Sequence, residues 1–517
     1  MDERLAAAWR LLPNYLGQHV LLSASALVLG LGLGLPLAVA ASRHARLRWI
    51  VLLLASLVQT IPSLALLALF YPLLLALSAL SKAVLGAGFS ALGFLPSLLA
   101  LTLYSMLPIL RNATTGILGV DPAVVEAARG VGMTDRQRLL QVELPLAAPV
   151  IMAGVRTAAV WTIGAATLST PVGQTSLGDY IFSGLQTEDW VLVLFGCAAA
   201  AALAMIVDQL LGLIETGAAL RDRRRIGAGL AGLVLGTLAA IAPLVVLGGQ
   251  VDTVVVGAKN FSEQSILAQV MADRLHDAGF SVTQKTDLGS VVAYRAVASG
   301  EIDAYVDYSG TLWTNVLKRT DNPPRAALLQ QLTQALKTRD GVDLQGALGF
   351  ENAYALAMRR DRAQALGIKT IADLARRAPE MTLGSDLEFL SRPEWAALRD
   401  AYGLHFKAER RFQPTFMYKS VTGGEVDVIS AFSSDGRIAA DDLVVLSDPK
   451  QAIPPYDAVI LLSPKRAHDP KFQRALAPML GAVPVETMRK ANLSVDRDRD
   501  KLTPAQAAKT LETTIGR

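Results

Sequence analysis

The loop at residues 121–149 carries residue types whose spacing could build a docking element for another protein. It reads DPAVVEAARGVGMTDRQRLLQVELPLAAP. Asp121 can cap a helix whose first residue is Pro122, because a carboxylate accepts hydrogen bonds from the open N–H groups of a first turn. Ala127 and Ala128 keep one face of this short helix thin, and the glycines that follow end it. The loop is suited to lie in a groove of a partner; the alternative is an ordinary amphipathic connection.

Motifs for other chemistry are missing or stand in the wrong setting. The sequence GAGLAG at 227–232 fits a dinucleotide-binding pattern, but it follows RDRRR inside an apolar stretch, where small residues favour close helix contact. No G-x-x-x-x-G-K-[ST] motif occurs, so a separate subunit must bind ATP if ATP drives this protein. His276, His405 and His468 belong to no recognisable catalytic motif, and Cys197 is the single cysteine. We expect no enzyme, no cofactor and no metal site.

Composition divides the chain near residue 250. Of the 517 residues, 52% are hydrophobic, which is high for a soluble protein, and the excess lies in the first half. Apolar stretches of about 20 residues are long enough to cross a bilayer as helices. The net charge of +4 is too small to indicate nucleic acid binding. We expect about six spans, the second of them tilted or broken near Pro62 or Pro72, at roughly 20–41, 50–79, 91–111, 146–168, 190–214 and 227–248.

Arginine placement predicts the orientation of these spans. Loops rich in Lys and Arg stay in the cytoplasm. Arginines cluster at 43–48, 111–138 and 221–225, in alternate connections between the spans. This pattern puts the N-terminus and everything after residue 249 outside the cell membrane. No secretory signal or lipid-anchor cysteine precedes the second half, so we expect the sixth span both to translocate and to tether it.

Residues 252–517 have the mixed pattern of an α/β domain with a cleft between two lobes. The chain is expected to cross between the lobes near Asn352–Ala357 and to return near Pro449–Pro455. Helical stretches are expected at 262–278, 325–338 and 394–402. Short apolar stretches predict strands at Val254–Val256, Met381–Leu383, Val426–Ile429, Val444–Leu446 and Val459–Leu462.

Several motifs give the chain a resemblance to a known family. Glu126-Ala-Ala-Arg-Gly-Val-Gly132 followed by Leu144-Pro145 is similar to the EAA---G---------LP pattern of ABC-importer permeases. The second half contains VVVGAKNFSEQSILAQ, GEIDAYVDYSGTLW, GFENAYALAMRRD, GEVDVISAFSSDG and PPYDAV, in this order. These resemble the glycine betaine/carnitine/choline-binding proteins of osmoprotectant importers. The chain as a whole resembles a fused permease and substrate-binding protein of that family.

The resemblance implies a division into domains. Residues 1–218 would form an all-α transmembrane permease whose EAA loop is 121–149. Residues 219–251 would be a basic cytoplasmic loop and an anchoring transmembrane helix. Residues 252–517 would form an extracytoplasmic type II periplasmic-binding-protein-like domain. Its lobe 1 would comprise about 252–352 and 455–517, and its lobe 2 about 353–454.

The resemblance also implies site residues. Those that couple transport to the ATPase would be Glu126, Ala127, Ala128, Gly132 and Pro145. The family holds the quaternary ammonium in a box of aromatic rings, which here fall on Tyr308, Tyr354, Phe432 and Tyr456. Its carboxylate and polar contacts fall on Lys259, Gln264, Thr311 and Arg392, and Asn352 stands where some relatives carry an acid.

The chemistry of such a ligand asks for the same residue types. A trimethylammonium group has no N–H to donate, so aromatic faces must hold it, at about 0.5–2 kcal/mol per ring. A carboxylate at its other end favours Arg or Lys. The implied partners are two ATPase subunits, a second copy of this chain, the bilayer and a small quaternary ammonium molecule. Ergothioneine import and a tethered receptor without transport remain alternatives.

Overall fold

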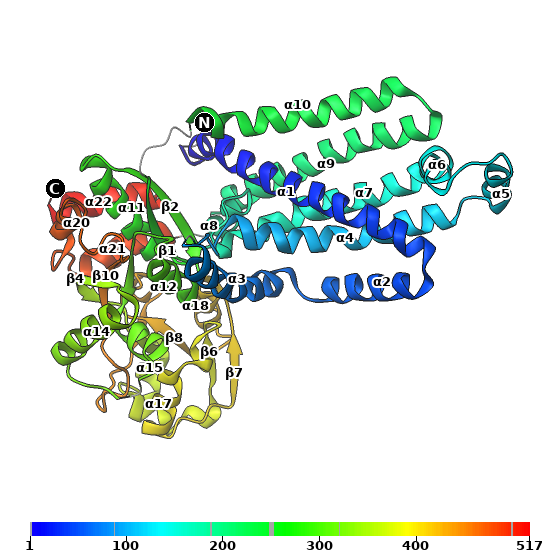
Figure 1. Ribbon diagram of the computed structural model, residues 1–517. Coiled ribbons are helices and arrows are strands. Elements are labelled where there is room, and N and C mark those ends of the chain that lie inside the picture. The colour runs from blue at the N-terminus through cyan, green and yellow to red at the C-terminus, as the bar shows by residue number, and fades with distance from the viewer. Residues whose placement is uncertain are drawn as a thin grey trace. The chain divides into compact units, whose positions relative to one another are not determined.

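The computed structural model describes residues 3–86, 88–186, 189–247, 253–319, 321–497 and 500–516. The chain divides into two compact units, which we name the membrane unit and the binding unit (Figure 1). The membrane unit comprises Met1–Phe182 and Val191–Gly249, and the binding unit comprises Ser183–Trp190 and Gln250–Arg517. The expected boundary at 251/252 and the expected end of the sixth span at 248 lie outside the described residues.

The membrane unit is a bundle of helices. Among the described residues, six helices are long and apolar enough to cross a membrane, as the sequence predicted. The second apolar stretch breaks at Pro62, while Pro72 stays inside a helix. The first helix begins at Glu3, well before the expected residue 20. The bundle helices are α1 (Glu3–Arg43), α2 (Ala45–Thr60), α3 (Ser63–Leu85), α4 (Phe94–Leu118), α7 (Leu144–Ala166), α8 (Gly178–Gln186), α9 (Trp190–Leu220) and α10 (Arg223–Leu247).

Small residues let these helices approach one another. Helices α1, α4 and α7 contact each other around a core that contains Leu110 and Val155. In α10, a Cβ on Gly229 would come within 2.7 Å of the Leu210 carbonyl oxygen of α9. A Cβ on Gly232 would come within 2.6 Å of the Leu210 side chain. The GAGLAG stretch therefore lies inside α10 and serves helix contact, as the sequence analysis expected of its small residues.

Two five-stranded sheets form the binding unit, one in each lobe. The lobe 1 sheet has the order β2-β1-β3-β10-β4, and the lobe 2 sheet has the order β7-β6-β8-β5-β9. The strands of lobe 1 are β1 (Thr253–Lys259), β2 (Ser281–Leu288), β3 (Ala304–Tyr308), β4 (Asp343–Glu351) and β10 (Asp457–Leu462). Those of lobe 2 are β5 (Tyr354–Arg359), β6 (Thr382–Ser385), β7 (Ala408–Arg411), β8 (Val428–Phe432) and β9 (Leu443–Val445). Every strand that the sequence predicted is present.

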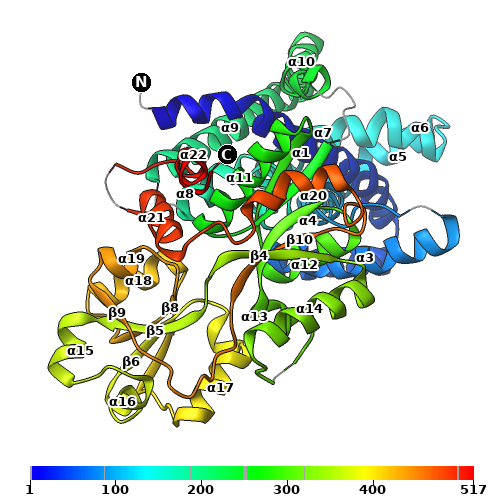
Figure 2. The same ribbon diagram turned by 90° about the vertical axis from the view of Figure 1, so that its left-hand side faces the viewer.

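Helices cover both sheets, and Figure 2 shows α15–α19 gathered around the lobe 2 strands. All six residues of β10 are buried, because this strand lies between β3 and β4. The chain crosses between the lobes at 352–353 and returns between β9 and β10, as expected. The helices are α11 (Ser262–Asp277), α12 (Ser290–Ser299), α13 (Ser309–Thr311), α14 (Arg325–Asp340), α15 (Arg360–Leu366), α16 (Ile371–Ala375), α17 (Pro393–Tyr402), α18 (Pro414–Thr422), α19 (Arg437–Ala440), α20 (Pro470–Leu476), α21 (Val485–Asp496) and α22 (Pro504–Ile515).

Candidate ligand-binding site

The predicted ligand contacts come from strand ends in both lobes. Lys259 is the last residue of β1 and Tyr308 is the last residue of β3, its parallel neighbour. In lobe 2, Tyr354 begins β5 and pairs with Phe432, which ends β8. Tyr456 immediately precedes β10 of lobe 1. Carboxyl ends of parallel strands meet at one sheet edge, which is where α/β proteins commonly hold ligands.

The aromatic side chains form one continuous group of rings, which we name the cage. Tyr354 lies with its ring centroid 5.0 Å from that of Phe432 and 6.1 Å from that of Tyr456. Phe261 joins Phe432 to Tyr308, at 6.5 Å and 6.1 Å respectively. The four predicted rings therefore come together across the two lobes. Phe261 was not predicted; it lies in the same NFSEQ stretch as Gln264, at the N-cap of α11.

A buried carboxylate that the sequence did not single out stands behind Tyr308. Glu263 is 3% exposed and accepts a hydrogen bond of 2.5 Å from the Tyr308 hydroxyl. It also accepts hydrogen bonds from Asn352, Ser434 and Asn492, at 3.1, 2.6 and 2.8 Å. Burial raises the pKa of this carboxyl above its usual range. Asn352 therefore lies at the site and donates a hydrogen bond to the Glu263 carboxylate.

A second buried carboxylate lies at Tyr456. Glu394, in α17 of lobe 2, accepts hydrogen bonds from the Tyr456 hydroxyl and, at 2.9 Å, from Thr314. Among the described residues its Oε2 atom has no hydrogen-bond partner. Because Tyr456 and Thr314 belong to lobe 1, these bonds cross between the lobes. A buried anion with an unsatisfied oxygen is costly unless a cation or donor faces it.

Arg392 lies beside the same acid. Its guanidinium carbon is 5.2 Å from the centroid of the Tyr354 ring, and one of its terminal nitrogens is 3.6 Å from Glu394. The other terminal nitrogen is 2.8 Å from Glu388. The Nε–H is buried without a hydrogen-bond partner in the described part of the chain. Arg392 therefore reaches the cage with one donor still available.

The remaining predicted contacts have partners within lobe 1. Lys259 forms an ion pair with Asp307, and both side chains are buried. Gln264 donates to the Tyr308 hydroxyl at 3.0 Å and accepts from the Lys259 backbone N–H at 3.3 Å. Thr311 is buried in α13, three residues after Tyr308. The structure thus gives Lys259 and Gln264 roles in positioning the cage, whereas their contact with a ligand carboxylate stays a prediction.

Burial also fixes the protonation of the cage tyrosines. It raises the pKa of Tyr308, Tyr354 and Tyr456 well above the usual value for a phenol. Each hydroxyl is therefore protonated at neutral pH. Two of them donate to carboxylates, and this fixes the orientation of their rings.

The predicted docking loop forms two short helices beyond the ends of α4 and α7 (Figure 1). Asp121 caps α5 (Pro122–Gly130) by accepting from the Ala123 N–H at 2.9 Å, as predicted. Thr134 caps α6 (Asp135–Arg138) through a capping box with Gln137. Gly132 joins them with a φ of +83°, which favours glycine. Glu126, Ala127, Gly132 and Pro145 are exposed and Ala128 is buried.

Buried charges hold this loop against the bundle. Arg138 donates to Glu143 at 2.9 Å, and Arg43 at the end of α1 forms a second ion pair with Glu143. Glu143 closes a π-helical turn, Leu139–Glu143, that leads into α7. This ion-pair cluster was not predicted. The signal for it in the sequence was an arginine in the loop together with an acid directly before Leu144-Pro145.

Comparison with known proteins defines the class. Residues 252–511 match the family described as the substrate binding domain of ABC-type glycine betaine transport system. Residues 30–219 match the family described as binding-protein-dependent transport system inner membrane component. The chain therefore belongs to the ABC-importer family in which a permease is fused to a betaine-type substrate-binding domain.

Individual relatives share this arrangement or one of its halves. The ergothioneine transport permease/ergothioneine binding protein EgtU of Helicobacter pylori (strain G27) is 28% identical over 473 residues, covering 88% of this chain and 81% of that protein. The glycine betaine/carnitine/choline transport system permease protein OpuCB of Bacillus subtilis is 41% identical over 199 residues, covering 38% of this chain and 84% of that protein. A crystal structure of a glycine betaine/carnitine/choline ABC transporter is 26% identical, covers 50% of this chain and 97% of its own, and gives a TM-score of 0.45.

The family and the apolar helices together indicate where in the cell the protein lies. The chain is a multi-pass inner membrane protein with an extracytoplasmic-type substrate-binding domain. A permease of this family works with an ABC ATPase and carries a small molecule. Its relatives are transporter components, as the sequence analysis expected when it found no catalytic motif.

Proposed function

We propose that the binding unit captures a quaternary ammonium compound such as glycine betaine, choline or carnitine, and that the membrane unit passes it into the cell. The observation that carries this proposal is the cage of Tyr308, Phe261, Phe432, Tyr354 and Tyr456. Aromatic faces attract a cation that cannot donate hydrogen bonds, because each ring has a negative quadrupole above its plane. Several rings in one group are the arrangement used for trimethylammonium ligands.

The two acids behind the cage support a positively charged ligand. Glu263 and Glu394 both lie at the hydroxyl ends of cage tyrosines, and both are nearly fully buried. The only lysine of the predicted contacts, Lys259, is balanced by Asp307. Because charges act over longer distances in a buried site than in water, these carboxylates favour a cation within the rings.

Arg392 supports a carboxylate at the other end of the ligand. Its free Nε–H and its position beside Tyr354 would let it bind an anion close to the cation held by the rings. A betaine has both charges, whereas choline has only the cation. We therefore favour a betaine over choline.

The docking loop supports transport over binding alone. Its exposed apolar side chains, Val124, Val131 and Leu140, are 40%, 77% and 53% exposed and lie beside the EAA residues. Exposed apolar groups at the tip of a loop are suited to a protein partner. We propose that this loop docks on the ATPase, with two copies of the chain and two ATPase subunits in one importer. A tethered receptor without transport would not need it.

We also propose the functional boundaries given above: permease 1–218, basic loop and anchor 219–251, and binding domain 252–517.

Ergothioneine is a second candidate ligand, because the relative from Helicobacter pylori is named for it and this molecule is also a trimethylammonium betaine. All the betaines share the head group and the carboxylate, so the contacts made by the rest of the ligand decide which betaine is bound.

Calorimetric titration of purified residues 252–517 with a panel of ligands tests the proposal. We expect one site per chain for at least one of glycine betaine, carnitine, choline, proline betaine and ergothioneine. Glycine serves as the control, because its ammonium keeps its N–H groups and lacks the methyl groups. Equal binding of glycine, or no binding of any quaternary compound by folded protein, would contradict the proposal.

A further inference from the structure

One buried carboxylate joins three elements of the membrane unit. Glu143 is 1% exposed and ends the π-helical turn that leads into α7. Its Oε1 atom accepts a hydrogen bond of 2.9 Å from Arg138 at the end of α6, and one of 3.2 Å from Arg43, the last residue of α1. Its Oε2 atom also forms an ion pair with Arg43. Helices α6, α1 and α7 therefore meet at a single side chain.

The π-helical turn is what brings Arg138 and Glu143 together. In an α-helix, residues three and four apart share a face, so two residues five apart do not. The turn at Leu139–Glu143 is wound with i to i+5 bonds, and this winding places Glu143 against Arg138. Single π-helical turns inside helices are frequent at functional sites. The local backbone is therefore shaped to build this ion pair.

Other side-chain bonds of the docking helices stay within the loop. Asp121 caps its own helix, and Thr134 and Gln137 bond to each other in the capping box of α6. Within the described residues, Arg138 is the one residue of 121–138 whose side chain makes a hydrogen bond or ion pair to a residue outside this range. The polar connection of α5 and α6 to the bundle therefore passes through Arg138.

Helix α1 is the element that depends on this connection. The backbone itself joins the loop to α4 and α7, whereas α1 is joined to the loop by Arg43 and Glu143. Arg43 binds both oxygens of the carboxylate, which fixes the orientation of the pair as well as its distance. Separating these groups would leave buried charge without a partner, and this is costly. A displacement of α6 is therefore passed to Glu143 and from it to Arg43.

The end of α1 is a place from which a displacement can spread. This helix has 41 residues and is about 60 Å long. It contacts α2, α4, α7 and α10. A movement of its cytoplasmic end therefore changes the packing of much of the bundle.

We propose that Glu143 is a positioning residue that carries the movement of the docking helices to α1 during transport. The inference rests on the proposed function, in which the docking loop binds the ATPase. Arg138 receives the displacement from α5 and α6, Glu143 passes it on, and Arg43 moves the end of α1. Because Glu143 also begins α7, the two helices move together.

Import by the full chain with its ATPase in proteoliposomes tests the proposal. The probes are radiolabelled glycine betaine, carnitine and ergothioneine, and the readout is the number of molecules imported per ATP hydrolysed. Arg43→Ala should lower this ratio about 2- to 30-fold, the range for a residue that transmits coupling between sites, while the ATPase stays bound. Arg43→Lys should restore part of the ratio, because an ammonium still pairs with Glu143. Arg46→Ala removes the same charge at an exposed position and is the matched control, which should leave the ratio unchanged.

Arg43 is the residue to change first, because its side chain is 37% exposed and Glu143 keeps Arg138 as a partner. A second variant separates coupling from stability. If Arg43 acts through Glu143, then Glu143→Gln alone and Glu143→Gln combined with Arg43→Ala should give the same ratio, whereas independent residues would give additive losses.

Equal ratios for the parent and Arg43→Ala, or additive losses in the double variant, would overturn this inference and leave the proposed function standing. Release of the ATPase from Arg43→Ala would show that the ion pairs only maintain the shape of the loop, and would also overturn it. No import of any probe by the folded parent with its ATPase would overturn both the inference and the proposed function.

Discussion

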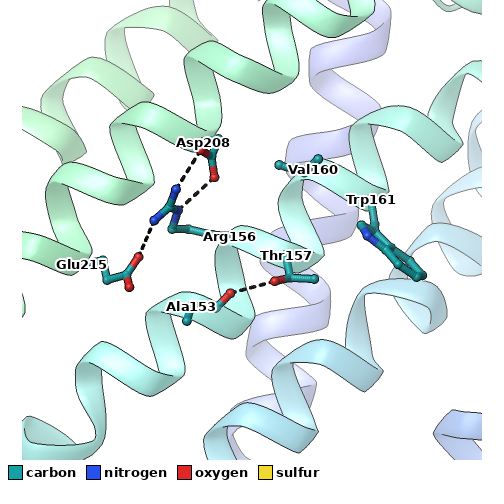
Figure 3. Close-up of a pocket in the computed structure, with 7 residues that line it drawn as sticks. All are labelled: Ala153, Arg156, Thr157, Val160, Trp161, Asp208 and Glu215. Carbon is teal, nitrogen blue, oxygen red and sulfur yellow. Dashed lines mark hydrogen bonds and ion pairs between the residues drawn. The ribbon is translucent and has the colours of Figure 1, made fainter.

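The cage and an ion-pair cluster of the membrane unit, formed by Arg156, Asp208 and Glu215, hold charged side chains in apolar surroundings by different means (Figure 3). In the binding unit, Glu263 is satisfied by neutral hydroxyl and amide donors and is almost fully buried. In the membrane unit, Asp208 is paired directly with an arginine and keeps a quarter of its surface exposed. An acid held by neutral donors leaves its charge for a bound cation, whereas an acid paired with an arginine does not. The comparison teaches that the partners of an acid, and not its burial alone, decide whether it can serve a cationic ligand.

The largest effect is expected from a change outside both of these regions. Ala127 is exposed on α5, and Ala127→Trp adds a bulky ring to the thin face of the docking helix. We expect uptake and ligand-stimulated ATP hydrolysis to fall by at least about ten-fold, because the loop no longer fits its groove. Ligand affinity should not change. Transport assays in proteoliposomes with the ATPase measure the first effect, and calorimetry measures the second.

Ala127→Ser is the matched control, since it adds one oxygen atom and leaves the helix thin. Normal import by Ala127→Trp would show that α5 is not the coupling helix.

A pH titration of stability tests the buried acids of the binding unit. Asp496 accepts a hydrogen bond from Ser262, next to Glu263, and burial raises its pKa to about 6 although Arg437 opposes the shift. The folded protein therefore keeps a proton that the unfolded chain loses near pH 4. Stability should fall as the pH rises from about 4 to about 6, by up to about 3 kcal/mol, and then level off.

Asp496→Asn should make this fall in stability smaller, because the amide does not titrate, while Glu263 and Asp287, whose pKa values are also raised by burial, still contribute to it. Denaturant unfolding of residues 252–517 at a series of pH values measures the difference between the two profiles. Asp442→Asn, at an exposed side chain, is the control and should leave the profile as it is. A wild-type curve that rises between pH 4 and 6 would contradict the assignment.

Removal of a single ring tests the cage itself. Tyr308→Ala and Tyr456→Ala should each weaken ligand binding by about 1–2 kcal/mol, or roughly ten-fold. The corresponding Phe variants keep the ring but leave Glu263 or Glu394 short of a donor. They should lower stability by about 1–3 kcal/mol while affinity falls less than in the Ala variants. Equal affinities for parent and Ala variants that remain folded would show that these tyrosines are packing residues.

The smallest effect is expected at Phe432. Its ring lies between those of Tyr354 and Phe261, and it is only partly buried. Phe432→Tyr keeps the ring face, so affinity and stability should change by less than about 0.5 kcal/mol. A large loss, measured by calorimetry and thermal unfolding, would mean that the position has no room for a hydroxyl.

Much of the fold could be predicted from the sequence, because periodicity and length report burial directly. The six spans and the strands of buried apolar residues, such as β10, have strong local signals. By contrast, β7 is an edge strand of four exposed residues, Ala408–Arg411, and has no hydrophobic pattern to reveal it. The start of α1 was missed for a related reason, because its first turns contain charged residues and Pro13.

The candidate site was predictable where a motif carried it. The cage rings Tyr308, Tyr354 and Tyr456 came from conspicuous sequence motifs. Glu263 and Glu394 were missed because an acid in a helix is usually solvated, and only the tertiary contacts show these two to be buried. The pairing of Lys259 with Asp307 likewise depends on the neighbouring strands β1 and β3, which a linear sequence does not place side by side.

The central claim is that the rings recognise a positive charge and not merely a bulky apolar group. Calorimetric titration of purified residues 252–517 with glycine betaine and with 3,3-dimethylbutanoate tests it directly, because the two have the same shape and the same carboxylate and differ by the charged nitrogen. The account predicts that glycine betaine binds and that the analogue without the positive charge binds at least about ten-fold more weakly, or not at all. Equal affinity for the two compounds would contradict it.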